Sequence, residues 1–325
     1  MFLQILVLLA VSGSAVLGDE EVLKNLTTVT WAHAVNNKTY LQAALASDVQ
    51  MLEADIVLGQ LIGKEGPPIP VMAHPPATTS DLSLGDFLSI VAQHNKGIAK
   101  DKQKGVKLDF KSIEAFEKAQ DLIARFSKPE DSQARTTDAP CSPCSRRDFS
   151  AAKSPEMSAQ NDSVTFPVWL NADILPGPVA ATTKPLDPEK FIKLASNHPR
   201  AVLSVGWTTR YGGNITEGEY TRQQIGTMLR MVNALKVNQT ITFPVRAGLA
   251  SNSQPVILDL LRETRALGSS VTVWSAEGDA VAVERLRALI LTVGLEHTYL
   301  DVPAELAARL QLPAPPATRT QKSHN

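Results

Sequence analysis

The chain carries acidic residues two positions apart inside apolar segments. Glu53 and Asp55 interrupt the segment MLEADIVL, and Asp109 is followed two residues later by Lys111 in GVKLDFK. Residues two apart in a β-strand point to the same face, so each pair is expected to share a face. Three carboxylates provide hard oxygen ligands, which suit Mg²⁺ or Ca²⁺ better than zinc. We therefore predict that Glu53, Asp55 and Asp109 bind Mg²⁺ or Ca²⁺.

Two histidines and a lysine could supply the remaining chemistry of such a site. His33 ends the segment TTVTWAH and His74 ends PIPVMAH. We predict that they act as a general base and a general acid on either side of a reacting phosphorus. Lys111 is predicted to hold a phosphate oxygen and to offset developing negative charge. The alternatives are histidines hydrogen-bonded within the core and a structural ion pair between Lys111 and the carboxylates.

Further polar residues follow the later strand candidates. Asn171 and Asp173 lie in VWLNADIL, Arg246 in ITFPVRAGL and Trp274 in SVTVWSA. All four are predicted to contact substrate. Three of them also have a structural alternative. Asp173 could cap the turn before the next proline and glycine, and Arg246 could pair with a barrel carboxylate. Trp274 could pack in the rim of the barrel.

Strand and helix patterns alternate along nearly the whole chain. The strand candidates are 27–33, 51–58, 105–110, 166–175, 201–208, 241–249, 270–276 and 298–303, and the helical segments lie near 38–48, 83–95, 112–127, 187–197, 217–237, 252–267 and 279–293. Eight strands apolar on both faces predict an α/β fold, a single (β/α)₈ barrel of the TIM type. No G-x-G-x-x-G follows the first strand, so a doubly wound sheet is the second choice. In a barrel the strand ends meet at one rim, where the predicted site would form.

The N-terminal segment and the composition of the chain indicate where the protein is located. Residues 1–18, MFLQILVLLAVSGSAVLG, predict a signal peptide, and no second apolar stretch is long enough for a transmembrane anchor. A net charge of -1 gives no indication of nucleic-acid binding. We therefore predict a secreted, extracellular glycoprotein. The N-x-[ST] glycosylation sites are Asn25, Asn37, Asn161, Asn214 and Asn238.

The barrel is predicted to occupy 19–312, followed by a flexible tail over 313–325. The segment 127–163 is rich in Ser, Pro and Ala and is predicted to be a disordered insert. It contains the two cysteines of the chain, Cys141 and Cys144, which we interpret as an accidental pair in a loop.

The order of the motifs resembles a known group of enzymes. His33, the Glu53-Ala-Asp55 triplet, His74 and the Asp109-Phe-Lys111 triplet look like the metal-binding and acid–base pattern of glycerophosphodiester phosphodiesterases and the related spider-venom phospholipases D. The resemblance implies a barrel similar to phospholipase C-like phosphodiesterases, Mg²⁺ bound by the acids and catalysis by the histidines. The blocks WAHAVN, LEADI, VMAHPP, KLDFK, VWLNADILPGP and LSVGWTT resemble the menorin family more specifically, over about 28–303.

Two functions follow from this resemblance. One is a secreted, metal-dependent phosphodiesterase that acts on a small phosphodiester or a lipid head group. The other is a catalytically silent barrel that binds an extracellular adhesion or receptor protein, as the association of menorins with dendrite patterning implies. The phosphodiesterases commonly have Arg-Gly after the first histidine and Asp after the second, whereas this chain has Ala34-Val35 and Pro75-Pro76. The intact motif favours the enzyme, and the altered neighbours favour the binding protein.

Overall fold

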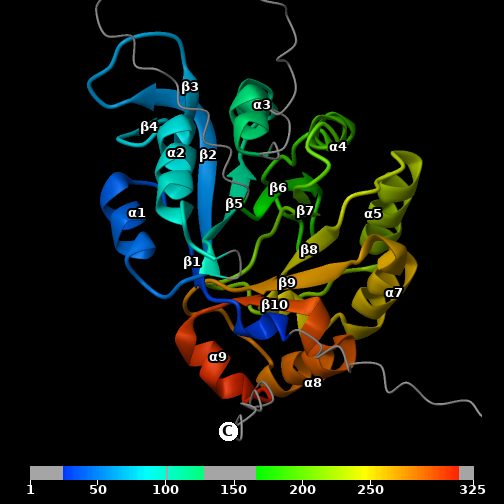
Figure 1. Ribbon diagram of the computed structural model, residues 1–325. Coiled ribbons are helices and arrows are strands. Elements are labelled where there is room, and N and C mark those ends of the chain that lie inside the picture. The colour runs from blue at the N-terminus through cyan, green and yellow to red at the C-terminus, as the bar shows by residue number, and fades with distance from the viewer. Residues whose placement is uncertain (1–24, 100–101, 128–165, 315–325) are drawn as a thin grey trace, which may run out of the picture.

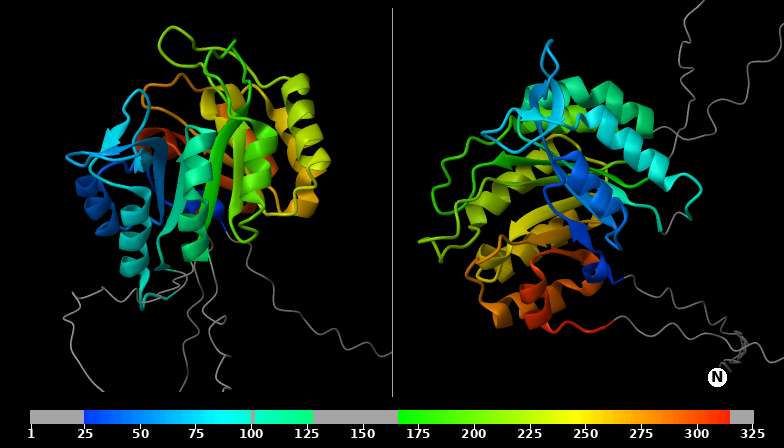
Figure 2. Two further views of the ribbon diagram at one scale, coloured as in Figure 1. Left: turned by 90° about the horizontal axis from the view of Figure 1, so that it is seen from above. Right: turned by 90° about the vertical axis from the view of Figure 1, so that its left-hand side faces the viewer.

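The computed structural model describes residues 25–99, 102–127 and 166–314. Eight parallel strands form a nearly closed barrel, with helices around it (Figures 1 and 2). The neighbouring strands are, in order, β1 (Trp31–Ala32), β2 (Met51–Leu61), β5 (Gly105–Phe110), β6 (Val168–Leu175), β7 (Val202–Trp207), β8 (Ile241–Arg246), β9 (Ser270–Trp274) and β10 (Thr298–Asp301). The predicted fold is therefore confirmed, because each strand candidate overlaps one barrel strand.

Four of the described helices begin where polar side chains satisfy free backbone N–H groups. Asn37, Ser83 and Asp187 cap α1, α2 and α4, and Thr221 forms a capping box with Gln224 at α5. The helices are α1 (Lys38–Leu45), α2 (Leu84–Asn95), α3 (Ile113–Ser127), α4 (Pro188–Ala195), α5 (Arg222–Ala234), α6 (Ala247–Ala250), α7 (Gln254–Thr264), α8 (Val283–Val293) and α9 (Ala304–Leu310). Within the described residues no helix is long and apolar enough to cross a membrane.

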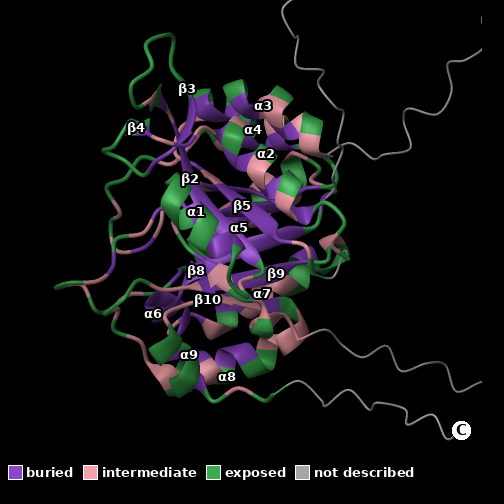
Figure 3. Ribbon diagram, turned by 60° about the vertical axis from the view of Figure 1, so that its left-hand side comes forward, coloured by how far each residue is buried: buried purple, intermediate pink, exposed green. Residues whose placement is uncertain are grey.

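Along each strand, successive side chains point alternately toward the surrounding helices and toward the barrel interior. On β5, Val106, Leu108 and Phe110 belong to the core between strands and helices, whereas Lys107 and Asp109 line the interior. The ring of Phe110 packs on Phe116 of α3 with 4.4 Å between their centroids. Burial is accordingly highest along the strands (Figure 3). The apolar outer face fixes the strand, so that the polar residues face inward.

Three of the boundaries that differ from the predicted ones have clear local reasons. The first strand is only two residues long, because Asn25 caps a 3₁₀ turn, η1 (Leu26–Thr28), just before it. The strand predicted over 241–249 ends at Arg246, where α6 begins. The helix predicted from 217 begins at Arg222, after Gly218 with a φ of 148°. The terminal helix α9 was not predicted.

A short hairpin extends β2 beyond the barrel. β3 (Ile69–Met72) pairs antiparallel with β2, and β4 (Thr79–Ser80) pairs with the end of β2. The hairpin is visible at the upper left of Figure 1. His74 follows β3 directly, so this extension of the sheet brings the second histidine to the barrel rim.

Candidate functional site

A cavity of about 570 Å³ opens at the carboxyl ends of β1, β2, β5 and β6. The backbone turns and rim loops that surround it come from segments far apart in the sequence. Its lining includes nine of the ten residues predicted for catalysis, metal binding and substrate binding: His33, Glu53, Asp55, His74, Asp109, Lys111, Asn171, Asp173 and Trp274. The structure therefore brings together side chains that the sequence separates by more than two hundred positions.

The three acids predicted to bind metal form one compact group. Oxygen atoms of Glu53, Asp55 and Asp109 all lie within 4.8 Å of one another. Glu53 and Asp55 come from β2, and the parallel pairing of β2 with β5 aligns Asp55 directly with Asp109. The spacing results from strand register, which is set by the buried outer faces of both strands.

Backbone and amide groups hold two of these carboxylates in place. The backbone N–H of Ala34 donates to Glu53 Oε2 at 2.8 Å, and Ala34 adopts a left-handed conformation with a φ of 56°. Asn36 Nδ2 donates to Asp55 Oδ2 at 2.8 Å, while its Oδ1 accepts from the backbone N–H of Asp55 at 2.9 Å. The loop after β1 thus fixes both acids of β2.

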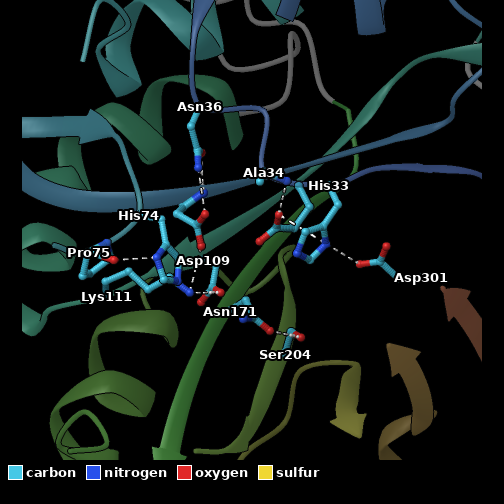
Figure 4. Close-up of polar contacts among 12 residues, drawn as sticks. His33, Ala34, Asn36, His74, Pro75, Asp109, Lys111, Asn171, Ser204 and Asp301 are labelled. Atoms are coloured by element: carbon cyan, nitrogen blue, oxygen red, sulfur yellow. Dashed lines mark hydrogen bonds and ion pairs between the residues drawn. The ribbon is translucent and has the colours of Figure 1, made fainter. Parts of the chain in front are cut away.

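Lys111 bridges two acids of the group (Figure 4). Its Nζ lies 2.8 Å from Asp55 Oδ1 and 2.6 Å from Asp109 Oδ2. Burial alone would lower the pKa of Lys111, but the charges of Asp109 and Asp55 raise it above its ordinary value. Burial alone would raise the pKa of Asp109, but the charges of Lys111 and Lys107 hold it below its usual range. Both groups are therefore charged at neutral pH.

His33 is paired with an acid from the last strand. Its Nδ1 lies 3.0 Å from Asp301 Oδ2 and 3.6 Å from Glu53 Oε2. Burial alone would lower the pKa of His33, but the hydrogen bond to Asp301 and the charge of Glu53 raise it to about 9. His33 is accordingly protonated at neutral pH, and its side chain is still 57% exposed to solvent.

His74 is held by its own neighbour. Its Nδ1 lies 2.7 Å from the carbonyl oxygen of Pro75, at the start of the Pro75-Pro76 pair. A carbonyl oxygen only accepts hydrogen bonds, so Nδ1 of His74 carries a hydrogen, and Nε2 is the nitrogen that remains for proton transfer. Figure 4 shows the two imidazoles on opposite sides of the carboxylate group in that view.

Five carboxyl groups lie in the cavity or immediately beside it: Glu53, Asp55, Asp109, Asp173 and Asp301. Four basic side chains lie among them, from His33, Lys107, Lys111 and Lys184. Burial raises the pKa of Glu53 to about 7, and burial together with the charge of Asp109 raises the pKa of Asp173 to about 7. A divalent ion would favour the ionised form of both acids, and a compact group of hard carboxylate oxygens fits Mg²⁺ or Ca²⁺.

The residues predicted to bind substrate fall into two sets. Asn171 lines the cavity, and its Oδ1 accepts from Ser204 Oγ at 2.6 Å. Asp173 and Trp274 also line the cavity. Arg246 lies apart from it: Nε and one terminal nitrogen each lie 2.8 Å from the carboxylate of Asp279. This geometry corresponds to the structural alternative for Arg246, in which it pairs with a carboxylate of the barrel instead of contacting substrate.

Sequence reasoning missed several residues that shape the site. Asn36 and Ser204 orient predicted residues, Asp301 pairs with His33, and Lys107 lines the cavity. The alternation of β5 could have indicated Lys107, which stands two residues before Asp109. The partner of His33 depends on the near closure of the barrel, which brings the last strand to the first.

The predicted glycosylation sites lie on the surface where the structure describes them. Asn37, Asn214 and Asn238 are exposed, and Asn25 is half-buried. The side chains of Asn25 and Asn37 also cap η1 and α1. Asn161, both cysteines, the predicted signal peptide and nearly all of the 127–163 insert lie outside the described residues.

The fold and the site define the class of protein: a (β/α)₈ barrel with a carboxylate–histidine site at the carboxyl ends of its strands. The chain belongs to the menorin family, because the family model for the menorin N-terminal domain matches residues 25–135 and 151–307. The unmatched interval, 136–150, contains both cysteines. The resemblance to the menorin family that the motifs indicated is therefore confirmed.

Two further similarities were found. The human protein FAM151B is 32% identical over 259 residues, which make up 79% of this chain and 76% of that protein. The crystal structure of the HMG-CoA lyase from Brucella melitensis superposes with a TM-score of 0.38 at 11% identity, covering 84% of this chain and 80% of that one.

Proposed function

We propose that this menorin-family chain is a metal-dependent phosphodiesterase. The observation that supports it best is the compact group of Glu53, Asp55 and Asp109 in one cavity with two imidazoles, each held through Nδ1. A divalent ion held by these acids would stabilise negative charge on a phosphate oxygen during cleavage. The substrate class is a small phosphodiester or a lipid head group.

The two histidines have different hydrogen-bond partners, and this difference assigns their roles. His33, protonated beside Asp301, is the general acid that gives its Nε2 proton to the departing oxygen as the P–O bond breaks. His74, with Nδ1 hydrogen-bonded to Pro75, is the general base that takes the proton of the attacking hydroxyl at Nε2. Lys111 lies beside Asp55 and Asp109, where it can hold a phosphate oxygen.

Calorimetric titration with Mg²⁺ and Ca²⁺ tests the proposal. The wild-type protein is compared with the double variant Glu53→Gln/Asp55→Asn. Outer-shell partners of a metal are worth about 10- to 100-fold in affinity, so loss of two charged ligands is expected to weaken binding by more than about 100-fold. Hydrolysis of bis(p-nitrophenyl) phosphate, a generic phosphodiester, is expected to fall in parallel.

Glu217→Gln/Glu219→Gln is the matched control, because these exposed acids are also two positions apart and lie outside the cavity. It is expected to bind metal as the wild type does. Wild-type protein that binds neither ion would refute the metal-dependent reaction. A barrel that recognises an extracellular adhesion or receptor protein by its surface would then be the better hypothesis.

We also propose that the chain is secreted and glycosylated, on the basis of the signal-peptide pattern and the exposed sequons Asn37, Asn214 and Asn238. Expression in cultured animal cells is expected to place the protein in the medium in a form whose mass falls on treatment with a glycosidase. Retention inside the cells without such a mass change would refute this part of the proposal.

A further inference from the structure

Lys107 is a buried lysine in the interior of the barrel. It stands on β5 in register with Glu53 of β2 on one side and with Trp169 of β6 on the other. Only 4% of the residue is exposed, and it lines the same cavity as the carboxylates. Its position on β5, two residues before Asp109, directs it to the same face as that acid.

Within the described part of the chain, the side-chain ammonium of Lys107 has neither a hydrogen-bond acceptor nor an ion-pair partner. Its one recorded contact is with the ring of Trp31, whose centroid lies 5.9 Å from Nζ. Lys104 shows the usual arrangement for a buried lysine, because its Nζ donates to the carbonyl oxygens of Ser47 and Val49. Lys111 is likewise paired with Asp55 and Asp109.

Strand register places Lys107 beside the predicted ligands. It shares the inward face of β5 with Asp109 and stands opposite Glu53 of β2, and all three residues line one cavity. Lys111 lies against Asp55 Oδ1 and Asp109 Oδ2, whereas Lys107 forms no ion pair with any carboxylate of the described residues. A divalent ion bound by these acids would therefore share the cavity with an ammonium whose charge no direct partner in the described part of the chain offsets.

We propose that Lys107 is a positioning residue of the metal site, a built-in cation whose charge limits how tightly the carboxylate group binds a divalent ion. The inference rests on the proposed function, because it requires that Glu53, Asp55 and Asp109 bind the ion. Lys107 and the ion share the same acids, and they repel each other. The repulsion between an ammonium and a divalent ion within one partly buried cavity corresponds to at least about tenfold in affinity.

Lys107→Met tests this inference, since methionine keeps much of the length and the apolar stem but removes the charge. Calorimetry with Mg²⁺ and with Ca²⁺ is expected to show binding at least about tenfold tighter than in the wild type. The increase in melting temperature on addition of Mg²⁺ is expected to be larger in the variant as well. A lysine with a purely structural role would lower the melting temperature without tightening metal binding.

Lys184→Met is the matched control, because it removes the same charge from an exposed position at the edge of the same cavity. Its metal affinity is expected to stay close to that of the wild type. Equal tightening in both variants would overturn the inference, because the effect would then follow net charge alone. Lys107→Gln is a second variant in case methionine prevents folding.

The remaining outcomes separate the two proposals. Wild-type protein that binds no divalent ion would refute the proposed function, and with it this inference. Wild-type protein that binds Mg²⁺ while both Lys107 variants bind it no more tightly would overturn only the role of Lys107. Failure of both variants to fold even in saturating Mg²⁺ would also overturn it, because the ion should compensate for the missing charge.

Discussion

Charged side chains are paired differently on two sides of the barrel rim. On the side of β8 and β9, Arg246 is matched by Asp279, whose carboxylate also accepts from Ser275 Oγ and from the backbone N–H of Ala276. The guanidinium lies over the ring of Trp274 as well, 4.9 Å from its centroid. On the side of β2 and β5, Lys111 is shared by two acids, and Glu53 has no lysine or arginine as an ion-pair partner among the described residues.

The difference separates polar groups that stabilise the fold by pairing with each other from polar groups that remain able to bind a ligand. The Arg246–Asp279 pair is closed, because each partner satisfies the other and the side chain of Asp279 is only 2% exposed. The β2–β5 side is open, because burial leaves the pKa of Glu53 at about 7. Incomplete pairing at a cavity is therefore a better indication of a site than the number of charged residues.

The largest effect on stability is expected from the closed side. Asp279→Ala leaves the guanidinium of Arg246 largely buried and without its partner, which is expected to cost about 3–5 kcal/mol in the free energy of unfolding. Affinity for Mg²⁺ is expected to stay within about twofold, because distant sites contribute independently. Urea denaturation and calorimetry measure the two quantities. A loss of metal affinity as large as that in Glu53→Gln/Asp55→Asn would remove the distinction between the two sides.

On the open side, Asp173→Asn is expected to stabilise the metal-free protein at neutral pH. The pKa of Asp173 is raised to about 7 by burial and by the charge of Asp109. The unfolded state loses its proton near the ordinary value of about 4, so wild-type stability falls as the pH rises from about 4 to 7. The variant lacks this penalty and is expected to gain about 2–4 kcal/mol at pH 8, and nothing at pH 4.

Urea denaturation of both proteins across this pH range, in the presence of a chelator, measures the gain. An equal difference between the two proteins at pH 4 and pH 8 would contradict the raised pKa. It would also show that Asp173 is better compensated than the described contacts indicate.

The smallest effect is expected from the link between the first and last strands. Asp301→Asn removes the charge that raises the pKa of His33, so that this pKa falls from about 9 toward its ordinary value. If His33 is the general acid, the alkaline limb of the phosphodiesterase pH profile moves to lower pH, and activity at pH 8 falls by about tenfold or more. NMR titration of the imidazole reports the pKa, and an unchanged value would show that Asp301 does not hold the proton on His33.

Much of the fold could be predicted because its signals are local. The apolar alternation of β2 and β5 fixes which face Glu53, Asp55 and Asp109 share, and a barrel brings strand ends to one rim. That reasoning placed nine of the ten predicted residues around one cavity. The exception, Arg246, also ends a strand, but its partner Asp279 lies in the loop after the next strand and was invisible in the sequence pattern.

The remaining features depend on contacts between distant segments. Asp301 is 268 positions from His33, and only the near closure of the barrel joins them. Asn36 looked like an ordinary loop residue beside the Asn37 sequon, yet its amide holds both the side chain and the backbone N–H of Asp55. Such roles follow from three-dimensional packing, and no periodicity of the chain encodes them.

The long strand β2 determines the relative positions of most residues of the site. It carries Glu53 and Asp55, pairs with β1 just before His33, pairs with β5 at Asp109, and pairs with β3 just before His74. A shift of β2 by a single residue would therefore displace the acids, the lysine bridge and both imidazoles together. An insertion within β2 is therefore expected to disrupt the whole rim at once, whereas insertions in the loops beyond its ends leave this register unchanged.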